Sequence, residues 1–190
     1  MLPKVLKNFN LFINGRGYAG RVDEISLPTL AIRTEEFQLG GLDTPLQMDM
    51  GMDKLECQLT LREYDPEVIK LLGLINGSNV SKLPGLVGLG AAGEGIGFTL
   101  RGGLSDESVT VGQKTDIDII PVIVHLRGAV IELDFGQWKA GQNAAFTARL
   151  TLWYYSLNID GDALIEIDVN NMYRKIDGVE QVRALKGTVF

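Results

Sequence analysis

The sequence predicts a mainly β protein with one short α-helix, built as a β-sandwich or barrel. Three observations support this fold class. Most apolar segments alternate with a period of two residues, as half-buried strands do. Turn dipeptides such as Asn14-Gly15 and Asp160-Gly161 lie beside these segments. The chain shows no internal repeat, no coiled-coil heptad and no alternation of strands with helices.

Strands are expected in five places besides the stretch from residue 46 to 61, which is treated separately. These segments are Phe9–Asn14, Arg21–Thr34, Ile117–Leu133, Ala144–Tyr155 and Ile165–Val169. Pro28 interrupts the second segment, which favours an edge strand or a bulge because proline cannot donate to a strand ladder.

The stretch from residue 46 to 61 changes its apolar face partway along. Apolar residues occupy even positions from Leu46 to Met50 and odd positions from Leu55 to Leu61. A continuous strand cannot change face, so a turn or bulge is expected within residues 51–53. The pattern predicts a long hairpin or a bulged strand with one wet, acidic face, whose polar side chains are Gln47, Asp49, Asp53, Glu56, Gln58 and Thr60.

One helix is signalled between Asp65 and Gly73, with an N-cap at Asp65, proline at the first helical position and glycine at the C-terminal cap. Residues 73–103 hold ten of the 23 glycines. They indicate a glycine-rich, insertion-like loop at about residues 76–112 of a single domain that spans residues 1–190. A second short helix over Glu180–Lys186 is a further hypothesis.

Composition excludes several classes of function. The 190 residues carry a net charge of −6, which argues against static nucleic-acid binding. The single cysteine, Cys57, excludes an intrachain disulfide and a cysteine-rich zinc site, and the single histidine, His125, excludes sites with two imidazoles. No signal peptide is expected at the N-terminus. No membrane anchoring is expected either, because the weakly charged stretch Leu83–Leu100 is short and interrupted by glycines.

A glycine motif and a lone histidine are the first candidates for chemistry. Residues 88–93 match GxGxxG, but neither a strand before nor a helix after the motif is indicated, so a loop is favoured over a nucleotide site. His125 lies in a strand segment and is interpreted as a packing or interface residue.

Serines and paired carboxylates are the remaining candidates. Ser105 and Ser108 lack any nucleophile motif. The carboxylate pairs Asp116/Asp118 and Glu166/Asp168 are typical of metal or acid–base sites, but a solvated face or inter-subunit ion pairs are favoured on an acidic surface. We therefore expect no enzyme, no catalytic residue, no metal and no cofactor.

Short motifs in a fixed order then point to a known family. They are Leu2–Leu6 with Asn8–Gly15, Leu27–Leu30 with Thr34–Phe37, Gly40–Pro45 before Met48–Gly51, Gly136–Gly141, Tyr154–Leu157 with Asp160-Gly161, Glu166–Asp168 and Ile176–Val179. Together they resemble the major tail tube protein of contractile-tailed bacteriophages, and the related tube protein of R-type bacteriocins. The resemblance covers nearly all of the chain except about residues 76–112, and Leu42 stands where methionine is expected.

The resemblance implies a structural protein whose hexameric rings stack into a hollow tube, with strands of each subunit joined into one inner barrel. It implies the tail sheath protein, baseplate and tail-terminator proteins, a tape-measure protein in the lumen and DNA in transit as partners. It places the protein in the virion tail after assembly in the host bacterial cytoplasm. The alternative within this class is the tube of a genome-free contractile bacteriocin.

Two groups of residues become candidate assembly sites. Unpaired strand edges in a soluble domain are a hazard that ring closure removes. The wet face, with Gln47, Asp49, Asp53, Glu56, Gln58 and Thr60, is expected to line the lumen, because an acidic wall repels phosphates and lets DNA slide. Gly40, Gly41, Asp43, Thr44 and Pro45 are expected to contact a neighbouring ring or subunit. Two other classes of function remain: a nucleotide-binding enzyme that uses the glycine-rich loop, and a β-barrel binding module that does not assemble.

Overall fold

The computed structural model describes most of the chain, namely residues 4–38, 40–41, 43–62, 64, 66, 69, 95–106, 118–141 and 145–182. Twelve strands are found there: β1 (Val5–Ile13), β2 (Arg16–Gly17), β3 (Val22–Ser26), β4 (Ile32–Phe37), β5 (Leu46–Met52), β6 (Leu55–Leu61), β7 (Ile96–Asp106), β8 (Asp118–Asp134), β9 (Phe146–Ile159), β10 (Asp162–Asp168), β11 (Tyr173–Ile176) and β12 (Val179–Glu180). The mainly β fold class is confirmed. Within these residues no helix is long and apolar enough to cross a membrane.

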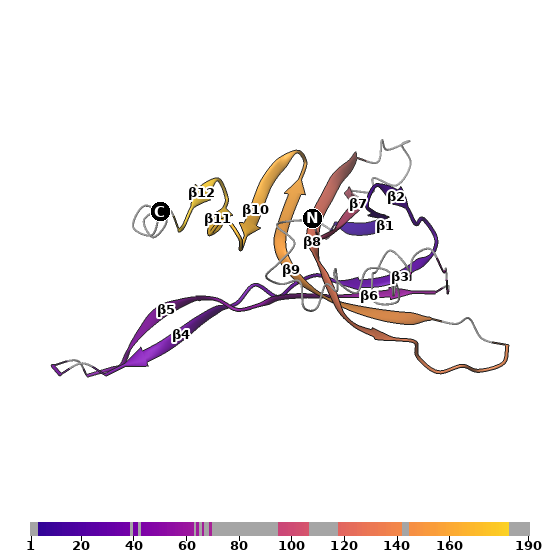
Figure 1. The fold of residues 1–190 in the computed structure, drawn as a ribbon. Coiled ribbons are helices and arrows are strands. Elements are labelled where there is room, and N and C mark those ends of the chain that lie inside the picture. Colours follow the sequence, from indigo (N-terminus) through magenta and orange to yellow (C-terminus); the bar gives the residue numbers. More distant parts are fainter. Residues whose placement is uncertain are drawn as a thin grey trace.

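Ten strands form one antiparallel sheet organised around β9 (Figure 1). The first half of β9 pairs with β6, and the second half pairs with β10 on the same edge. The other edge of β9 pairs with β8 along nearly its full length. From there the sheet continues through β7 and β1 to β2 on one side, and through β10 and β11 to β12 on the other.

Irregularities in β8 and β9 divide this sheet into two parts. The β8–β9 register shifts between Arg127 and Gly128 and again between Val130 and Glu132. One part contains β1, β7, β10 and the adjoining halves of β8 and β9, and the other contains β3, β6 and the remaining halves. Both contribute to a single core: Leu11, Ile13, Phe98, Leu100, Val124, Leu126, Tyr155 and Ile167 from the first part, and Leu55, Cys57, Leu59, Leu61, Val130, Phe146, Ala148, Leu150 and Leu152 from the second.

A long ribbon runs from residue 22 to 61 and leaves the core at its far end. The chain goes outward through β3 and β4 and returns through β5 and β6, so β3 pairs with β6 and β4 pairs with β5. We call the β4–β5 part with its tip, residues 32–52, the arm; Figure 1 shows it projecting from the rest of the fold.

Residues 46–61 were predicted to form either a hairpin or a bulged strand, and the structure distinguishes the two. A hairpin within this stretch is wrong, because β5 and β6 follow one another and pair with different strands. The bulged strand is right: Gly51 has a φ of +93°, and the β4–β5 register shifts near Met52. Glycine suits this position because the left-handed backbone conformation carries no side-chain penalty there.

Part of the glycine-rich segment is a strand. Ile96–Asp106 is β7, an eleven-residue strand between β1 and β8, so the loop expected at about residues 76–112 is wrong for this part. The rest of that range, including the GxGxxG match, lies outside the described residues. Of the helix predicted from Asp65 to Gly73, only Pro66 and Ile69 are described, and it stays a prediction. Glu180 ends β12 instead of beginning a helix, and residues 183–190 lie outside the description.

Candidate functional site

The arm has an apolar face and a polar face, and both are exposed. Register places Phe37 opposite Leu46 and Glu35 opposite Met48 on one face. The exposed fractions of Leu46, Met48 and Met50 are 50%, 49% and 50%. This face therefore carries exposed apolar side chains beside the Glu35 carboxylate, and exposed apolar side chains gathered on a projecting ribbon are typical of a protein–protein contact.

The polar face of the arm carries two of the residues predicted to line a lumen. Gln47 donates a hydrogen bond from Nε2 to Glu36 Oε1 at 3.3 Å. Asp49 Oδ2 lies 3.5 Å from Arg174 Nη2 on β11, which links the base of the arm to the β10–β11 hairpin. The Arg174 side chain is only 13% exposed, whereas that of Asp49 is 51% exposed.

The tip of the arm contains all five residues of the predicted inter-subunit loop. Gly40, Gly41, Asp43, Thr44 and Pro45 are exposed. Gly41 has a φ of +94°, and a Cβ atom there would meet no atom within 4 Å. The tip lies at the end of the ribbon farthest from β3 and β6. Its exposed residues are open to contact from another molecule.

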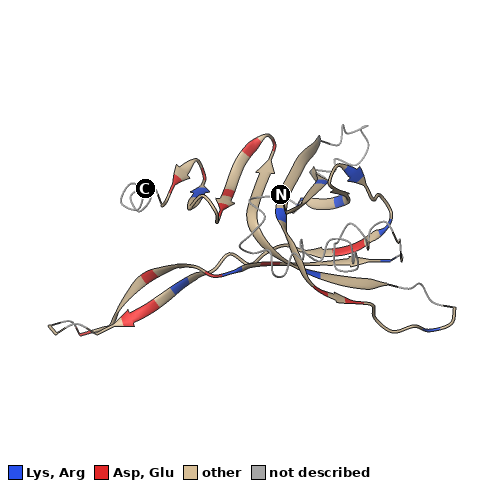
Figure 2. Cartoon of the chain, viewed as in Figure 1, with Lys and Arg blue, Asp and Glu red and all other residues tan. Residues whose placement is uncertain are grey.

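A second polar surface covers the part of the sheet formed by β3, β6 and the adjoining halves of β8 and β9. Register and exposure place on it the side chains that point away from the core; we call this the polar sheet face, and it comprises Glu24, Ser26, Glu56, Gln58, Thr60, Glu132, Asp134, Thr147, Arg149 and Thr151. It has four carboxylates and one guanidinium, so its formal charge is −3, one minus four. Figure 2 shows acidic residues along β3 and along the arm.

Cross-strand pairs order the polar sheet face. The hydroxyl groups of Thr60 and Thr147 lie 3.4 Å apart. Arg149 forms an ion pair with Glu132 on β8. Within one segment, Lys54 Nζ lies 2.6 Å from Glu56 Oε1. These exposed pairs add little stability, but they fix the side chains in rows across the strands.

The six predicted lumen residues therefore fall into two groups. Glu56, Gln58 and Thr60 lie together on the polar sheet face, whereas Gln47 and Asp49 lie on the polar face of the arm. Asp53 lies at the junction, where its backbone N–H donates to the Ala31 carbonyl. The β8 and β9 members of this surface were not among the predicted lumen residues, although Thr147, Arg149 and Thr151 alternate with buried residues along β9.

Two strand edges of the same part of the sheet are left open among the described strands. β3 pairs with β6 alone. β7 pairs with β8 only as far as Gly128, so Ala129–Asp134 of β8 pairs with β9 alone. In the order β3–β6–β9–β8, these are the two outer edges, and each presents unpaired backbone donors and acceptors.

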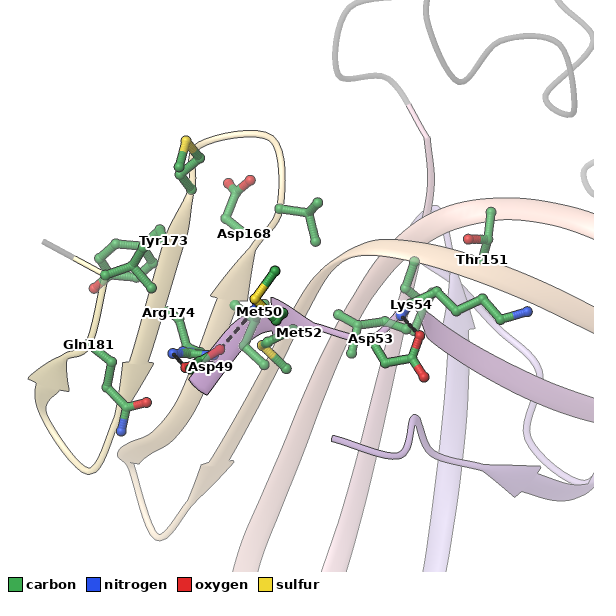
Figure 3. A pocket seen from close by; sticks show the side chains of 17 residues that line it. Asp49, Met50, Met52, Asp53, Lys54, Thr151, Asp168, Tyr173, Arg174 and Gln181 are labelled. Atoms are coloured by element: carbon green, nitrogen blue, oxygen red, sulfur yellow. Dashed lines mark hydrogen bonds and ion pairs between the residues drawn. The ribbon is translucent and has the colours of Figure 1, made fainter. Parts of the chain in front are cut away.

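A cavity of about 710 Å³ lies between the base of the arm and the β10–β11 hairpin (Figure 3). Apolar side chains from both sides line it, including Met50, Met52, Leu152, Ile167, Val169 and Met172. Asp53, Asp168 and the Asp49–Arg174 pair lie among its polar lining residues. No sequence pattern signalled this cavity, because its walls come from two distant parts of the chain, within residues 49–55 and 151–182.

At the opposite end of the fold, the loop after β8 presents aromatic side chains. Phe146 is buried, and the Tyr64 ring stacks on it and on Phe135 with centroids 5.9 Å apart in each pair. The Tyr64 hydroxyl donates to the Phe135 carbonyl and accepts a 3.0 Å hydrogen bond from Trp138 Nε1. Trp138 is 81% exposed, the highest value among the exposed large hydrophobic side chains that the structure describes.

The lone histidine packs within the sheet. His125 Nδ1 lies 3.1 Å from Thr99 Oγ1, at a small polar recess of about 310 Å³ that Arg127 and Tyr154 also line. Burial raises the pKa of the Tyr154 hydroxyl, and the hydrogen bond that it donates to Glu166 acts in the same direction. A tyrosine that stays protonated suits a structural hydrogen bond.

The other candidate residues have structural partners or lie outside the description. Ser105 is buried and its hydroxyl donates to the Val5 carbonyl, while Ser108 and Asp116 are not described. Glu166 accepts from Tyr154, and Asp168 accepts two hydrogen bonds from Asn171, at 3.1 Å and 2.7 Å. Within the described ranges, no three His, Cys, Asp or Glu side chains gather in a way that would hold a metal ion.

Comparison with known proteins gives one family. A family model described as phage tail tube protein FII matches residues 3–82 and 85–188. The chain is 26% identical to the tail tube protein of Escherichia phage P2 over 183 residues, covering 95% of this chain and 94% of that protein. It is 28% identical to the major tail tube protein of Serratia phage KSP20 over 179 residues, covering 93% and 90%.

Two solved structures share the fold. One belongs to the sheath–tube complex of an extracellular contractile injection system in the extended state, with a TM-score of 0.55, 12% identity and coverage of 82% of this chain and 91% of that chain. The other belongs to the sheath/tube terminator of the same kind of system, with a TM-score of 0.51, 11% identity and coverage of 83% and 98%. At these identities the likeness concerns the arrangement of strands.

Proposed function

The chain belongs to the phage tail tube protein FII family, and from that premise we propose that six copies close into a ring and that rings stack into a hollow tube. Its role is structural: it is a tube protein of a contractile tail. The family model matches residues 3–82 and 85–188, which includes nearly all of the glycine-rich segment, and we treat residues 1–190 as one tube domain.

Ring closure uses the two open strand edges. In the part of the chain that the structure describes, β3 and residues 129–134 of β8 form the two opposite edges of the same part of the sheet. If the β8 edge of one subunit pairs with the β3 edge of the next, both of these edges find a partner and the sheets become one inner barrel. Such a head-to-tail contact closes when the rotation between subunits divides a full turn.

The structural observation that carries the proposal is the exposed arm. Its apolar face leaves Leu46, Met48 and Met50 each about half exposed on a ribbon with no covering element among the described residues. Burial against a neighbouring copy removes that surface from water. The tip, with Gly40, Gly41, Asp43, Thr44 and Pro45, then reaches a neighbouring subunit or ring.

The polar sheet face is the proposed lumen wall, with Glu56, Gln58 and Thr60 at its centre. Its charge of −3 per subunit repels phosphates, so DNA passes without binding. In this proposal Gln47 extends the wall along the arm, while the Asp49 carboxylate, paired with Arg174, and Asp53 line the cavity at the base of the arm. The other face of the same strands carries the core, which leaves this face free to line a water-filled channel.

The tube has defined partners in this proposal. A contractile sheath surrounds it, baseplate and terminator proteins bound its ends, and a tape-measure protein and then DNA occupy the lumen. The protein is assembled in the cytoplasm of the host bacterium and becomes part of the virion tail. The same geometry serves a genome-free contractile bacteriocin, which packaged DNA in the particle would distinguish.

Electron microscopy of the purified protein at increasing concentration tests the assembly. Rings and hollow tubes are expected, and a protein that stays monomeric at all concentrations contradicts the proposal. The lumen assignment has its own test in phage particles. Glu56→Lys with Gln58→Lys changes the wall by +3 per subunit, two from the first change and one from the second, and brings the polar sheet face from −3 to zero.

These particles should assemble normally but release DNA more slowly, because phosphates now meet a wall that attracts them more strongly. Asp160→Lys in the β9–β10 turn is the control for a changed surface charge. An unchanged rate of ejection, or a tube in which Glu56 and Gln58 pack between subunits, would refute the lumen assignment.

A further inference from the structure

We propose that Trp138 of one copy inserts into the cavity between the arm and the β10–β11 hairpin of another copy, in the adjacent ring. This contact rests on the proposed tube and deepens it by naming what joins successive rings. The occupant is the β8–β9 loop, residues 135–141, of a second copy of this chain.

Contacts with Tyr64 hold the exposed Trp138 side chain in one position. Its indole N–H donates to the Tyr64 hydroxyl at 3.0 Å, and its ring meets the Tyr64 ring edge-on with centroids 5.9 Å apart. Tyr64 is itself stacked on Phe146, which is buried. The tryptophan is therefore anchored on one side while 81% of its surface stays exposed, and a preorganised aromatic loses little entropy on binding.

The cavity has the size and lining that an indole needs. Its volume of about 710 Å³ exceeds that of one aromatic side chain and leaves room for the flanking loop residues. Met50, Met52 and Met172 line it, and methionine adapts its shape and packs well against aromatic rings. Figure 3 shows Met50 and Met52 directed into this space beside the Asp49–Arg174 pair.

Charge favours the same occupant. Lys139 follows Trp138, and the cavity lining holds three carboxylates, on Asp49, Asp53 and Asp168, against the cations of Lys54 and Arg174. Arg174 is paired with Asp49, and Lys54 is paired with Glu56 outside the cavity. Asp53 accepts a hydrogen bond from the Lys54 backbone N–H, and Asp168 accepts two from Asn171, but neither is in an ion pair among the described residues. A lysine brought in beside the indole can therefore approach them.

Direction decides which copy supplies the tryptophan. Figure 1 shows the arm and the β8–β9 loop at opposite ends of the long strands, while the open edges of β3 and β8 lie along their sides. The edges therefore join subunits around a ring, and the two ends join one ring to the next. A contact between unlike ends does not close on itself, so it propagates into a stack.

Three variants test the contact. Trp138→Ala removes the inserted side chain, Val169→Arg blocks the cavity at a residue that is 55% exposed, and Val179→Ala removes a 64% exposed apolar side chain outside the proposed contact. A buried aromatic of this kind is a hot spot, so Trp138→Ala and Val169→Arg should each raise the protein concentration needed for tubes at least about 30-fold. The Val179→Ala protein should form tubes like the wild type.

Mixing the two blocked variants gives a sharper outcome. Trp138→Ala rings keep an intact cavity and Val169→Arg rings keep the tryptophan, so a mixture should form paired rings that grow no further. A cysteine pair reports the same contact directly, since Lys139→Cys mixed with Val169→Cys should cross-link into dimers containing one chain of each. The natural Cys57 does not interfere, because it is buried and burial raises its pKa to about 12.

Normal tubes from the Trp138→Ala protein would overturn this contact and leave the proposed tube intact. Loss of tubes with Trp138→Ala but not with Val169→Arg would also overturn it, because the tryptophan would then bind elsewhere. Failure of the wild-type chain to form rings or tubes would instead contradict the proposed function. Tryptophan fluorescence in a Trp153→Phe background should shift to shorter wavelength on stacking, and an unchanged spectrum in assembled tubes counts against insertion.

Discussion

Removing two apolar side chains from the arm should weaken assembly without destabilising the subunit. Leu46 and Met48 lie next to each other on the apolar face and are 50% and 49% exposed in the single chain. The double variant Leu46→Ala/Met48→Ala removes surface that the isolated subunit does not bury but that a neighbouring copy would cover.

The magnitude follows from the exposed fractions. Fully burying a leucine or methionine contributes about 1.5–3 kcal/mol, so covering the remaining half of each contributes about 0.8–1.5 kcal/mol. The pair then accounts for about 1.5–3 kcal/mol per contact, which corresponds to about a 10- to 150-fold change in the association constant. The free energy of unfolding of the subunit should change by less than about 0.5 kcal/mol for each exposed site.

Two measurements on one preparation separate these effects. Sedimentation velocity over a range of concentrations gives the midpoint of assembly, and thermal unfolding of the unassembled protein gives its stability. Gln47→Ala is the matched control, since Gln47 lies between the two residues in sequence but on the opposite, polar face. Assembly of the double variant at the wild-type midpoint, or an equal loss from Gln47→Ala, would refute the assignment of the apolar face.

The remaining predictions concern the core, a close backbone approach, the buried thiol and the tip of the arm. Leu59→Ala should lower the free energy of unfolding by about 2–5 kcal/mol in urea titrations, since Leu59 is fully buried and a cavity would remain. Gly128→Ala should destabilise the fold in the same assay, because its Cβ would lie 2.1 Å from the Thr151 carbonyl oxygen. Burial raises the pKa of Cys57 from 9.0 to about 12, so its unfolded form ionises first and stability should fall as pH rises from about 9 towards 12. Cys57→Ala should remove that part of the pH dependence. Asp43→Arg at the exposed tip should shorten or weaken the tubes seen by electron microscopy while leaving thermal unfolding unchanged.

Each of these predictions has a contradicting result. Leu59→Ala with wild-type stability would mean that the core closes differently, and a neutral Gly128→Ala would mean that β8 and β9 are farther apart. Rapid alkylation of native Cys57 at pH 8 would show that the thiol is accessible. Unaltered tubes from the Asp43→Arg protein would make the tip peripheral.

Period-two alternation predicted the strands better than it predicted their partners. The change of face near Gly51 correctly indicated a bulge, but the same pattern fits a hairpin, and only the distant pairing of Leu55 with Leu152 decides between them. Alternation records which side chains are buried on each strand. It does not identify the neighbouring strand, because many strands with an apolar face could pair at the same position.

The glycine content of Ile96–Asp106 predicted a loop, but this segment is β7. Glycine is common in loops, and it is also found where strands pack too closely for a side chain. Gly102 and Gly103 lie inside β7, next to the register shift between Leu6 and Asn8 of β1, and a Cβ on them would come within 2.8 Å of Leu6 and Ile119 side-chain atoms. These glycines permit close packing and do not indicate a loop. The wet face of β6 was predictable from alternation, whereas the cavity and the Tyr64 support of Trp138 arise from long-range contacts that no local pattern records.

The wide sequence separation of β6 and β9 also governs how the chain is made. Leu61 is synthesised well before Phe146, its partner in the ladder. At about 5–20 residues per second, the finished ribbon waits about 4–17 s for the strand that completes its sheet. During that interval its apolar residues and both edges face solvent. Folding is further slowed by such distant pairings, so the yield of tube subunits should depend on chaperone capacity more steeply than that of a protein with local contacts.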